Sequence, residues 1–429
     1  MWEVPECTDV CVSWSDLDLM AQKSLDYCKE ILEDFELLNS LKESKFELAY
    51  TETLDLCAPC IIENLDIKNV VILSATVAMP RFYKVAGLRQ LPSFVPGPIT
   101  PYADEMTFTE RLRNFVFNIQ FDYYTMKWDH RFSQLFSKKY PGFPAPHEIY
   151  MEKTALMMIN VHEFFETPRP TTNMIKYIGG FALTQTKLLT KELDDLLNIR
   201  NMTVLFSMGS VARSVDMPEW LKKAVLETFD SFPDVTFIWK YEGGDIAFES
   251  HPNIFPMKWI PQIDLLADKR LSLFVTHGGM NSLLEATYHG KPLIVVPLFG
   301  DQYYNAKLVQ KSGIATVIEK NQLNRHTLTE AIREMLSTRK FAKESAFIAS
   351  MLEGRSEQYR KDIAKSAKII IEHGRLDHLI LHARNLNFLQ YYCLDVIGFI
   401  ATVLVAIIYL IFLLVRMIYK LIIPKLKRD

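Results

Sequence analysis

The segment FVTHGGMNSLLEATYHGKPLIVVPLFGDQ, residues 274–302, places a histidine and two glycines between an apolar run and a helix-forming run. The run SLFVT predicts a strand and GMNSLLEATYHG predicts a helix, with His277, Gly278 and Gly279 at their junction. Glycines let the backbone approach a ligand closely. The first turn of a helix offers unpaired N–H donors and a partial positive charge, which suit phosphate. The segment therefore predicts an anion site, although the G-x-x-x-x-G-K-[ST] pattern of a P-loop is absent.

Short apolar strands alternate with helices on both sides of this segment. We expect strands within 202–210, 235–239, 272–276, 293–297 and 314–319, and helices at 218–229, 261–267, 279–290, 301–313 and 327–336. This alternation is typical of an α/β fold in which helices cover both faces of a parallel sheet. Ligand groups in such folds lie at the carboxyl ends of the strands.

The earlier part of the chain has fewer clear signals. Its expected strands are 46–50, 70–75 and 154–161, and its expected helix is 104–138. Prolines predict irregular backbone at 91–102 and 141–146, and residues 164–181 are interpreted as a connection. The helical stretch 339–374 is expected to pack back across the body.

Length and composition limit the classes of protein. The chain has 429 residues, enough for two domains, and its net charge of −3 gives no drive toward nucleic acid. An NAD(P) oxidoreductase is disfavoured because G-x-G-x-x-G is absent. Cys57-Ala-Pro-Cys60 has the spacing of a redox or zinc half-site, but we favour ordinary packing of the six cysteines, with room for one disulfide.

The C-terminus predicts a membrane helix. Residues 396–415 contain no charge, and at 1.5 Å per residue they span roughly 30 Å, the thickness of the hydrocarbon layer. The basic tail 416–429 is then expected in the cytosol, with the body on the other side. Such a body needs an export signal, and the first residues lack the pattern of one.

Polar residues around the glycines suit a nucleotide sugar. Glu285 shares a helix face with Asn281 and can accept from ribose hydroxyls. Asp301 and Gln302 suit sugar hydroxyls, and Trp259 offers a ring for a base to stack on. Taken singly, each feature has an ordinary explanation as a turn, a core tryptophan or a helix cap. Their joint arrangement favours the ligand site.

These motifs resemble those of one known family. W-x-P-Q, H-G-G-x-N-S-x-x-E and D-Q occur between Trp259 and Gln302 at the spacing of the UDP-glycosyltransferases. FSMGS (206–210), FIWKY (237–241) and the C-terminal span resemble the animal, endoplasmic-reticulum-bound branch, the UDP-glucuronosyltransferases, and especially nematode members. Lysines three and five positions from the end resemble an endoplasmic-reticulum retrieval signal.

The resemblance implies a GT-B fold of two Rossmann-like domains, the first incomplete, plus one transmembrane helix. The implied ranges are a partial acceptor-binding domain at 1–182, a UDP-sugar-binding domain at 183–385, the span at 396–415 and the tail at 416–429. The implied substrate-binding residues are Ser207, Gly209, Ser210, Lys240, Trp259, Ile260, Gln262, Thr276, His277, Gly279, Asn281, Ser282, Glu285, Asp301 and Gln302. No metal and no cofactor is expected, because the UDP-sugar is a co-substrate.

The implied reaction is inverting transfer of a hexose, with glucuronic acid favoured over glucose, to a hydroxyl of a small lipophilic acceptor. The family uses a histidine base and a carboxylate that orients it, and Glu52 falls at the place of the carboxylate. None of the ten histidines precedes Glu52, so we expect the chain to lack the base and to transfer weakly. The alternative is a non-catalytic, membrane-anchored subunit that binds UDP-sugar and pairs with full-length relatives, within a homo- or hetero-oligomer.

Overall fold

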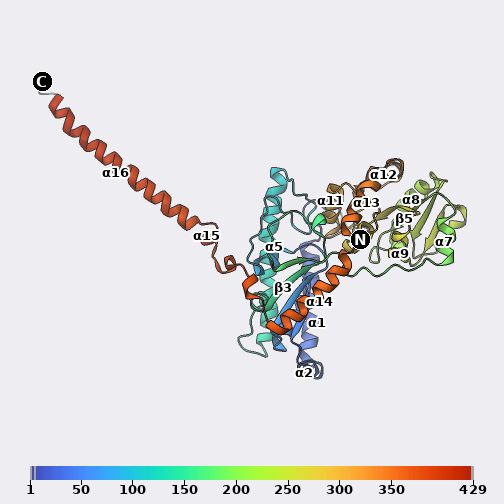
Figure 1. The fold of residues 1–429 in the computed structure, drawn as a ribbon, viewed down its shortest axis with the longest axis horizontal. Helices are drawn as coiled ribbons and strands as arrows, with labels where there is room; N and C mark the ends of the chain where they lie inside the picture. Colours follow the sequence, from blue (N-terminus) through green and yellow to red (C-terminus); the bar gives the residue numbers. More distant parts are fainter. Residues whose placement is uncertain (1, 4–5, 427–429) are drawn as a thin grey trace. The chain divides into compact units, whose positions relative to one another are not determined.

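The computed structural model describes residues 2–3 and 6–426, except for the side chains of 421–426. The chain forms two compact units, which divide after Leu379. The first unit holds two parallel sheets surrounded by helices, which confirms the predicted α/β class (Figure 1). The predicted boundary after residue 182 lies within this unit and stays a prediction, as does the end of the second domain at residue 385.

The first sheet has four parallel strands in the order β1-β2-β3-β4. They are β1 (Leu48–Glu52), β2 (Asn69–Ser74), β3 (Thr154–Ile159) and β4 (Ile175–Tyr177). The first three confirm the expected strands. The interpretation of 164–181 as a connection was wrong, because β4 lies within it and pairs with β3. Three residues are too few for a periodic signal.

Helices α1 (Trp14–Glu33), α2 (Phe35–Glu43), α3 (Ala58–Asn64), α4 (Pro80–Val85), α5 (Phe108–Ser137) and α6 (Pro146–Lys153) belong to this half. The expected helix at 104–138 is α5, which begins after a capping box formed by Thr107 and Glu110. Residues 91–102 and 141–145 are irregular, as the prolines predict.

The second sheet has six parallel strands in the order β10-β9-β8-β5-β6-β7. They are β5 (Met202–Ser207), β6 (Val235–Lys240), β7 (Ile254–Met257), β8 (Leu271–Thr276), β9 (Leu293–Val295) and β10 (Ala315–Val317). All except β7 were expected. Strand β7 contains Pro256 and lies at the edge of the sheet, where the missing N–H of proline is tolerated.

The helices of this half are α7 (Lys191–Leu197), α8 (Glu219–Asp230), α9 (Gln262–Ala267), α10 (Met280–Tyr288), α11 (Gln302–Lys311) and α12 (Arg325–Ser337). Short 3-10 segments lie at Glu163–Phe165, Ser214–Asp216, Phe248–Ser250, Lys320–Gln322 and Asp377–Leu379. Phe206, Phe229, Phe237 and Trp239 pack edge-on or stacked in a core that fixes the carboxyl ends of β5 and β6.

The stretch 339–374 forms two helices, α13 (Lys340–Leu352) and α14 (Arg355–His373), separated by Gly354 with φ of +74°. Tyr359 and Ile370 of α14 are buried with Val71 and Leu156 of the first sheet. The expected return of this stretch across the body is therefore confirmed.

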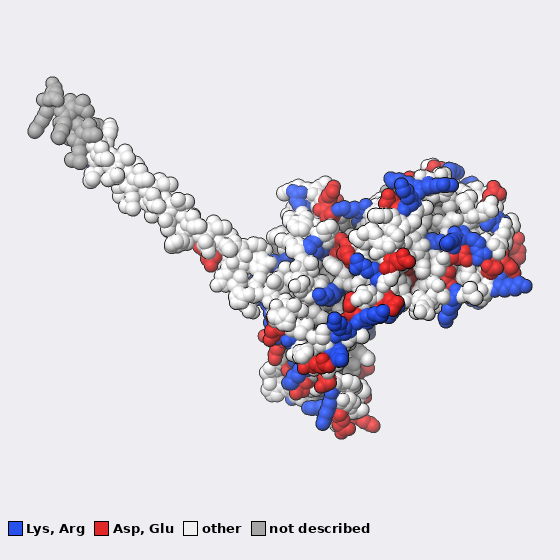
Figure 2. All heavy atoms as spheres, viewed as in Figure 1, with Lys and Arg blue, Asp and Glu red and all other residues white. Residues whose placement is uncertain are grey.

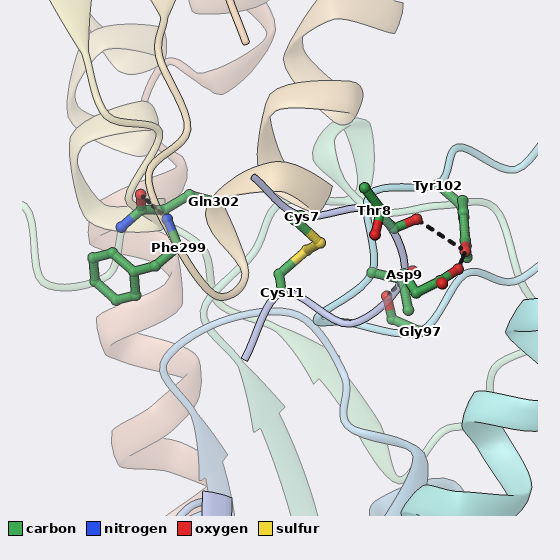
Figure 3. Close-up of a disulfide and its surroundings, with 9 residues drawn as sticks. Cys7, Thr8, Asp9, Cys11, Gly97, Tyr102, Phe299 and Gln302 are labelled. Atoms are coloured by element: carbon green, nitrogen blue, oxygen red, sulfur yellow. Dashed lines mark hydrogen bonds between the residues drawn. A yellow bond between two sulfur atoms is a disulfide. The ribbon is translucent and has the colours of Figure 1, made fainter. Parts of the chain in front are cut away.

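The expectation of ordinary packing with room for one disulfide was too low. The structure has two, Cys7–Cys11, which Figure 3 shows, and Cys28–Cys57. Cys57 pairs with Cys28 of α1 rather than with Cys60, which is free and buried. Among the described residues no group of histidine, cysteine and acidic side chains is arranged to hold a metal ion.

The second unit contains a 3-10 segment at His382–Asn385 and helices α15 (Phe388–Tyr391) and α16 (Leu394–Leu426). Residues Leu394–Lys420 of α16 include an 18-residue stretch with a mean hydropathy of 3.0, so the helix is long and apolar enough to cross a membrane. The predicted span at 396–415 lies within it. The predicted retrieval signal includes Lys427, which lies outside the described residues.

Candidate nucleotide-sugar site

An open cleft with about 1400 Å³ of empty space, some of it open solvent, lies at the carboxyl ends of β5, β6 and β8. This is where parallel sheets present ligand groups. Predicted site residues that line it are Ser207, Gly209, Ser210, Lys240, Trp259, Ile260, Gln262, His277, Gly279, Asn281, Ser282 and Glu285. The structure therefore brings most of the predicted set together.

His277 lies between two glycines that leave no room for a side chain. A Cβ on Gly209 would lie 2.6 Å from Cε1 of His277, and one on Gly279 would lie 2.5 Å from Nε2. Gly209 also has a φ of +80°, a backbone conformation that residues with a side chain rarely adopt. Burial lowers the pKa of His277 to about 4, so the ring is neutral at pH 7 and has one N–H to donate. The two glycines fix the ring at the start of α10.

The N-terminus of α10 faces the cleft without a side-chain cap. Gly279 is the N-cap residue and has no side chain to bond the N–H groups of the first turn. These donors can therefore serve an anion, as a helix N-terminus commonly does. Asn281 of this turn accepts a hydrogen bond of 3.1 Å from Nδ2 of Asn160, which follows β3 of the first sheet.

The carboxylate of Glu285 lies one turn further along α10 and meets the amide of Gln262, the first residue of α9. Nε2 of Gln262 donates to Oε2 of Glu285 at 2.6 Å and to Oγ of Ser282 at 3.1 Å. Burial raises the pKa of Glu285, and the bond from Gln262 partly offsets that rise. The second carboxylate oxygen of Glu285 has no hydrogen-bond partner in the described part of the chain, and it can accept from a ligand hydroxyl.

Trp259 and Lys240 lie at other parts of the cleft wall. Trp259 is 75% exposed, which is unusual for so large a ring and leaves it available for stacking. Lys240 pairs with Glu242, so its charge is already partly compensated before any ligand binds.

Thr276, Asp301 and Gln302 do not line this cleft. Thr276 is fully buried at the end of β8. Oε1 of Gln302 accepts from the N–H groups of Leu298 and Phe299, and the side chain is 3% exposed (Figure 3). Oδ2 of Asp301 accepts from the hydroxyl of Thr76, 2.7 Å away in the loop after β2, and from Nδ2 of Asn305 at 3.0 Å.

Glu52 lies at the end of β1, away from the residues that line the cleft. Its Oε2 accepts from the N–H of Leu54 at 2.5 Å, and its Oε1 accepts from the hydroxyl of Thr53 and the N–H of Ala75. No histidine in the described part of the chain is hydrogen-bonded to it. Its predicted catalytic role stays a prediction.

Comparison with known proteins decides the family. The family model for "UDP-glucoronosyl and UDP-glucosyl transferase" matches residues 2–429. The chain belongs to this family. It is 28% identical to mouse UDP-glucuronosyltransferase 2B17 over 411 residues, which is 93% of this chain and 76% of the relative. It is 31% identical to Xenopus laevis UDP-glucuronosyltransferase 3A1 over 398 residues, which is 91% of this chain and 75% of the relative.

Solved structures of other glycosyltransferases have the same fold as this chain. The kitacinnamycin glycotransferase matches with a TM-score of 0.57 and 19% identity, covering 83% of each chain. A UDP-glucosyltransferase from Polygonum tinctorium matches with a TM-score of 0.55 and 17% identity, covering 83% of this chain and 84% of the other. The predicted GT-B arrangement of two Rossmann-like sheets is therefore confirmed.

Several residues that line the cleft of this family member were not predicted from the sequence. Thr184, Gln185 and Lys187 line it from the segment between the two sheets, and Phe299 lines it after β9. The polar run TQTK after the glycines at 179 and 180 was the available signal. Thr76 was missed because its relation to Asp301 depends on tertiary structure alone.

Proposed function

We propose that this chain binds a UDP-sugar in the cleft and transfers the hexose to a hydroxyl of a small lipophilic acceptor. Glucuronic acid is the favoured sugar, since the named relatives are UDP-glucuronosyltransferases. Trp259 would stack on uracil, Glu285 would accept from the ribose, and His277 with the start of α10 would bind the diphosphate. The ring of His277, fixed between Gly209 and Gly279, is the observation that carries this proposal.

The sugar would lie between the two sheets. Asp301 is the proposed sugar-binding residue, together with Gln302. In the ligand-free arrangement Asp301 already accepts from Thr76 of the first sheet. A sugar hydroxyl must therefore share this carboxylate with Thr76 or replace it. Gln302 can offer only its amide nitrogen while its oxygen remains bonded to the main chain.

An apolar cavity in the first half is the proposed acceptor site. It has about 830 Å³ of empty space and is lined mainly by apolar residues of α1, α4 and α5, together with Thr53 and Leu54 next to Glu52. Arg81 contributes the one charged side chain of its lining, is 8% exposed and pairs with Asp129 at 2.5 Å. Its Nε and Nη1 lack a partner in the described chain, so they can donate to an oxygen of the acceptor.

Calorimetry on the full chain in detergent tests the donor site. UDP-glucuronic acid should bind, and Glu285→Gln should weaken binding about 10-fold, because a hydrogen bond to a charged group contributes about 1.5–3 kcal/mol. Glu330→Gln, an exposed carboxylate on α12, is the matched control and should leave the affinity unchanged. A folded chain that gives no heat with any UDP-hexose would contradict the proposal.

A second candidate function is a non-catalytic, UDP-sugar-binding subunit that pairs with full-length relatives. The main-chain bonds that occupy both oxygens of Glu52 favour it, since a carboxylate used in this way has little capacity left to orient a base. Donor binding without turnover, combined with co-purification of a relative, would support the subunit. Turnover by the purified chain, insensitive to EDTA, would support a metal-independent transferase.

We also propose that α16 anchors the chain in the endoplasmic reticulum membrane, with the body in the lumen and the tail in the cytosol. The two disulfides support an oxidising compartment for the body. Protease protection in sealed microsomes tests this. The body should be resistant until detergent is added.

A further inference from the structure

Helix α5 carries an apolar face that the described chain leaves uncovered. Its members are 42% to 72% exposed and follow one another at intervals of one, three or four residues: Phe108, Leu112, Phe115, Val116, Ile119, Tyr123 and Met126. This spacing aligns them on one side of the helix. We call this set the α5 stripe. At 1.5 Å per residue it is roughly 27 Å long.

The opposite side of α5 is buried in the core of the first half. Asn114, Phe117, Trp128, Phe132 and Phe136 are buried there. The helix is thus apolar on both sides, although a helix on the surface of a soluble protein is usually polar on its outer side. A contiguous apolar surface of this length indicates a binding surface. In the view of Figure 2 the surface over α5 is mostly uncharged, with scattered charged side chains.

The charges near the stripe suit a lipid headgroup layer. Arg111 and Arg113 are exposed near one end, where Arg113 pairs with Asp9, and Lys127 lies at the other end, where it pairs with Asp18. The acidic residues of α5 are engaged elsewhere: Glu110 caps the helix, Asp122 pairs with Lys84, and Asp129 is buried with Arg81. Aromatic and aliphatic side chains bordered by basic ones are typical of helices that lie in the interface of a membrane.

We propose that the α5 stripe lies in the surface of the membrane in which α16 is anchored. This inference rests on the proposed anchor, because a tethered body stays close to the bilayer and even a weak apolar surface then binds it. The stripe belongs to the same half as the acceptor cavity, which Phe121 and Tyr124 of α5 help to line. A lipophilic acceptor dissolved in the bilayer would then reach the cavity from the membrane side.

Lipid quenching of single-site fluorophores on the full chain tests this inference. The chain is reconstituted in phosphatidylcholine and phosphatidylserine vesicles that contain brominated lipids, in a Cys393→Ser background that removes the exposed thiol. Labelled Phe115→Cys and Ile119→Cys should be quenched at least twofold. Labelled Trp220→Cys, an equally exposed apolar position on α8, is the matched control and should not be quenched.

A label at Phe412→Cys in α16 separates this inference from the proposed anchor. If Phe412 is quenched and the stripe positions are not, the anchor stands and the inference is overturned. If the stripe is quenched and Phe412 is not, the surface contact stands and the anchor fails. If Ile119→Cys escapes lipid quenching and forms a cross-link between two chains, the stripe is a contact between copies, and the membrane contact is wrong.

Discussion

Two cavities of the body, the proposed donor cleft and the proposed acceptor cavity, are built in different ways. The donor cleft consists of strand ends, glycines and one helix N-terminus, so its shape depends mainly on backbone. The acceptor cavity is lined by apolar side chains that come from segments between Leu17 and Thr125, and Arg81 is its charged member. A site made of backbone tolerates little change, whereas a site made of side chains can change its ligand without a change of fold.

The largest expected effect is a loss of UDP-sugar affinity when a glycine of the donor cleft is replaced. In Gly279→Ala the new Cβ would overlap the ring of His277 and must displace it or the start of α10. Overpacking of this kind costs about 1–3 kcal/mol, so we expect UDP-sugar affinity to fall by about 10- to 100-fold. Gly244→Ala is the control, because nothing lies within 4 Å of its Cβ. An unchanged donor affinity in Gly279→Ala would show that the ring position is unimportant.

The next largest effect should be a loss of acceptor affinity without a loss of UDP-sugar affinity. Arg81→Lys keeps the ion pair with Asp129 but removes Nε and Nη1 as donors. We expect about 10-fold weaker binding of a lipophile that bears a carbonyl or hydroxyl oxygen, since one hydrogen bond to a charged group is lost. Binding of the deoxygenated analogue and of UDP-sugar should not change, which fluorescence titration can measure. Equal losses for both lipophiles would instead indicate a general repacking.

A smaller effect is expected at the exposed ring of the donor cleft. Trp259→Ala should weaken UDP binding about fivefold, because stacking of a base on an aromatic ring contributes about 1 kcal/mol. Trp220→Ala removes a ring that is 59% exposed outside the cleft and should have no effect on binding. Calorimetry with uridine alone sharpens this prediction. A loss seen with UDP but not with uridine would place the contact elsewhere.

The last prediction concerns stability rather than affinity, and its dependence on pH. The pKa of His277 is about 4 in the folded chain and near 6.5 when unfolded. Between these values the unfolded state binds the extra proton, so the stability from the neutral ring is present above about pH 6.5 and decreases toward pH 4. His277→Gln should show a shallower fall in the urea midpoint over this range. Parallel curves for both proteins would contradict the prediction.

The same contrast explains what could be predicted from the sequence. His277, Gly279, Asn281, Ser282 and Glu285 were predicted because glycine, histidine and helix-start signals are local. Other residues of the cleft were implied only by the resemblance to the UDP-glycosyltransferases: Ser207, Gly209, Ser210, Lys240, Ile260 and Gln262. Residues of the acceptor cavity, such as Leu17 and Arg81, carry no pattern, because only the packing of α1 and α4 against α5 brings them together.

Misses elsewhere have comparable causes. Strand β7 was hidden by Pro256, and β4 is too short for periodicity. The Cys28–Cys57 disulfide joins residues 29 positions apart, and a spacing of that length does not reveal a partner. Asp301 and Gln302 were predicted as neighbours of the sugar, but their bonds to Thr76 and to the main chain depend on how the loops are folded.

The return of α14 to the first sheet means that the two sheets are joined by two lengths of chain. One runs between β4 and α7, and the other passes Gly354, where a Cβ would meet no atom within 4 Å. Two bodies connected at two points can undergo a hinge motion about the axis through those points, whereas sliding and free rotation are resisted. The hydrogen bonds from Thr76 to Asp301 and from Asn160 to Asn281 join the two halves and would have to break and re-form in such a motion.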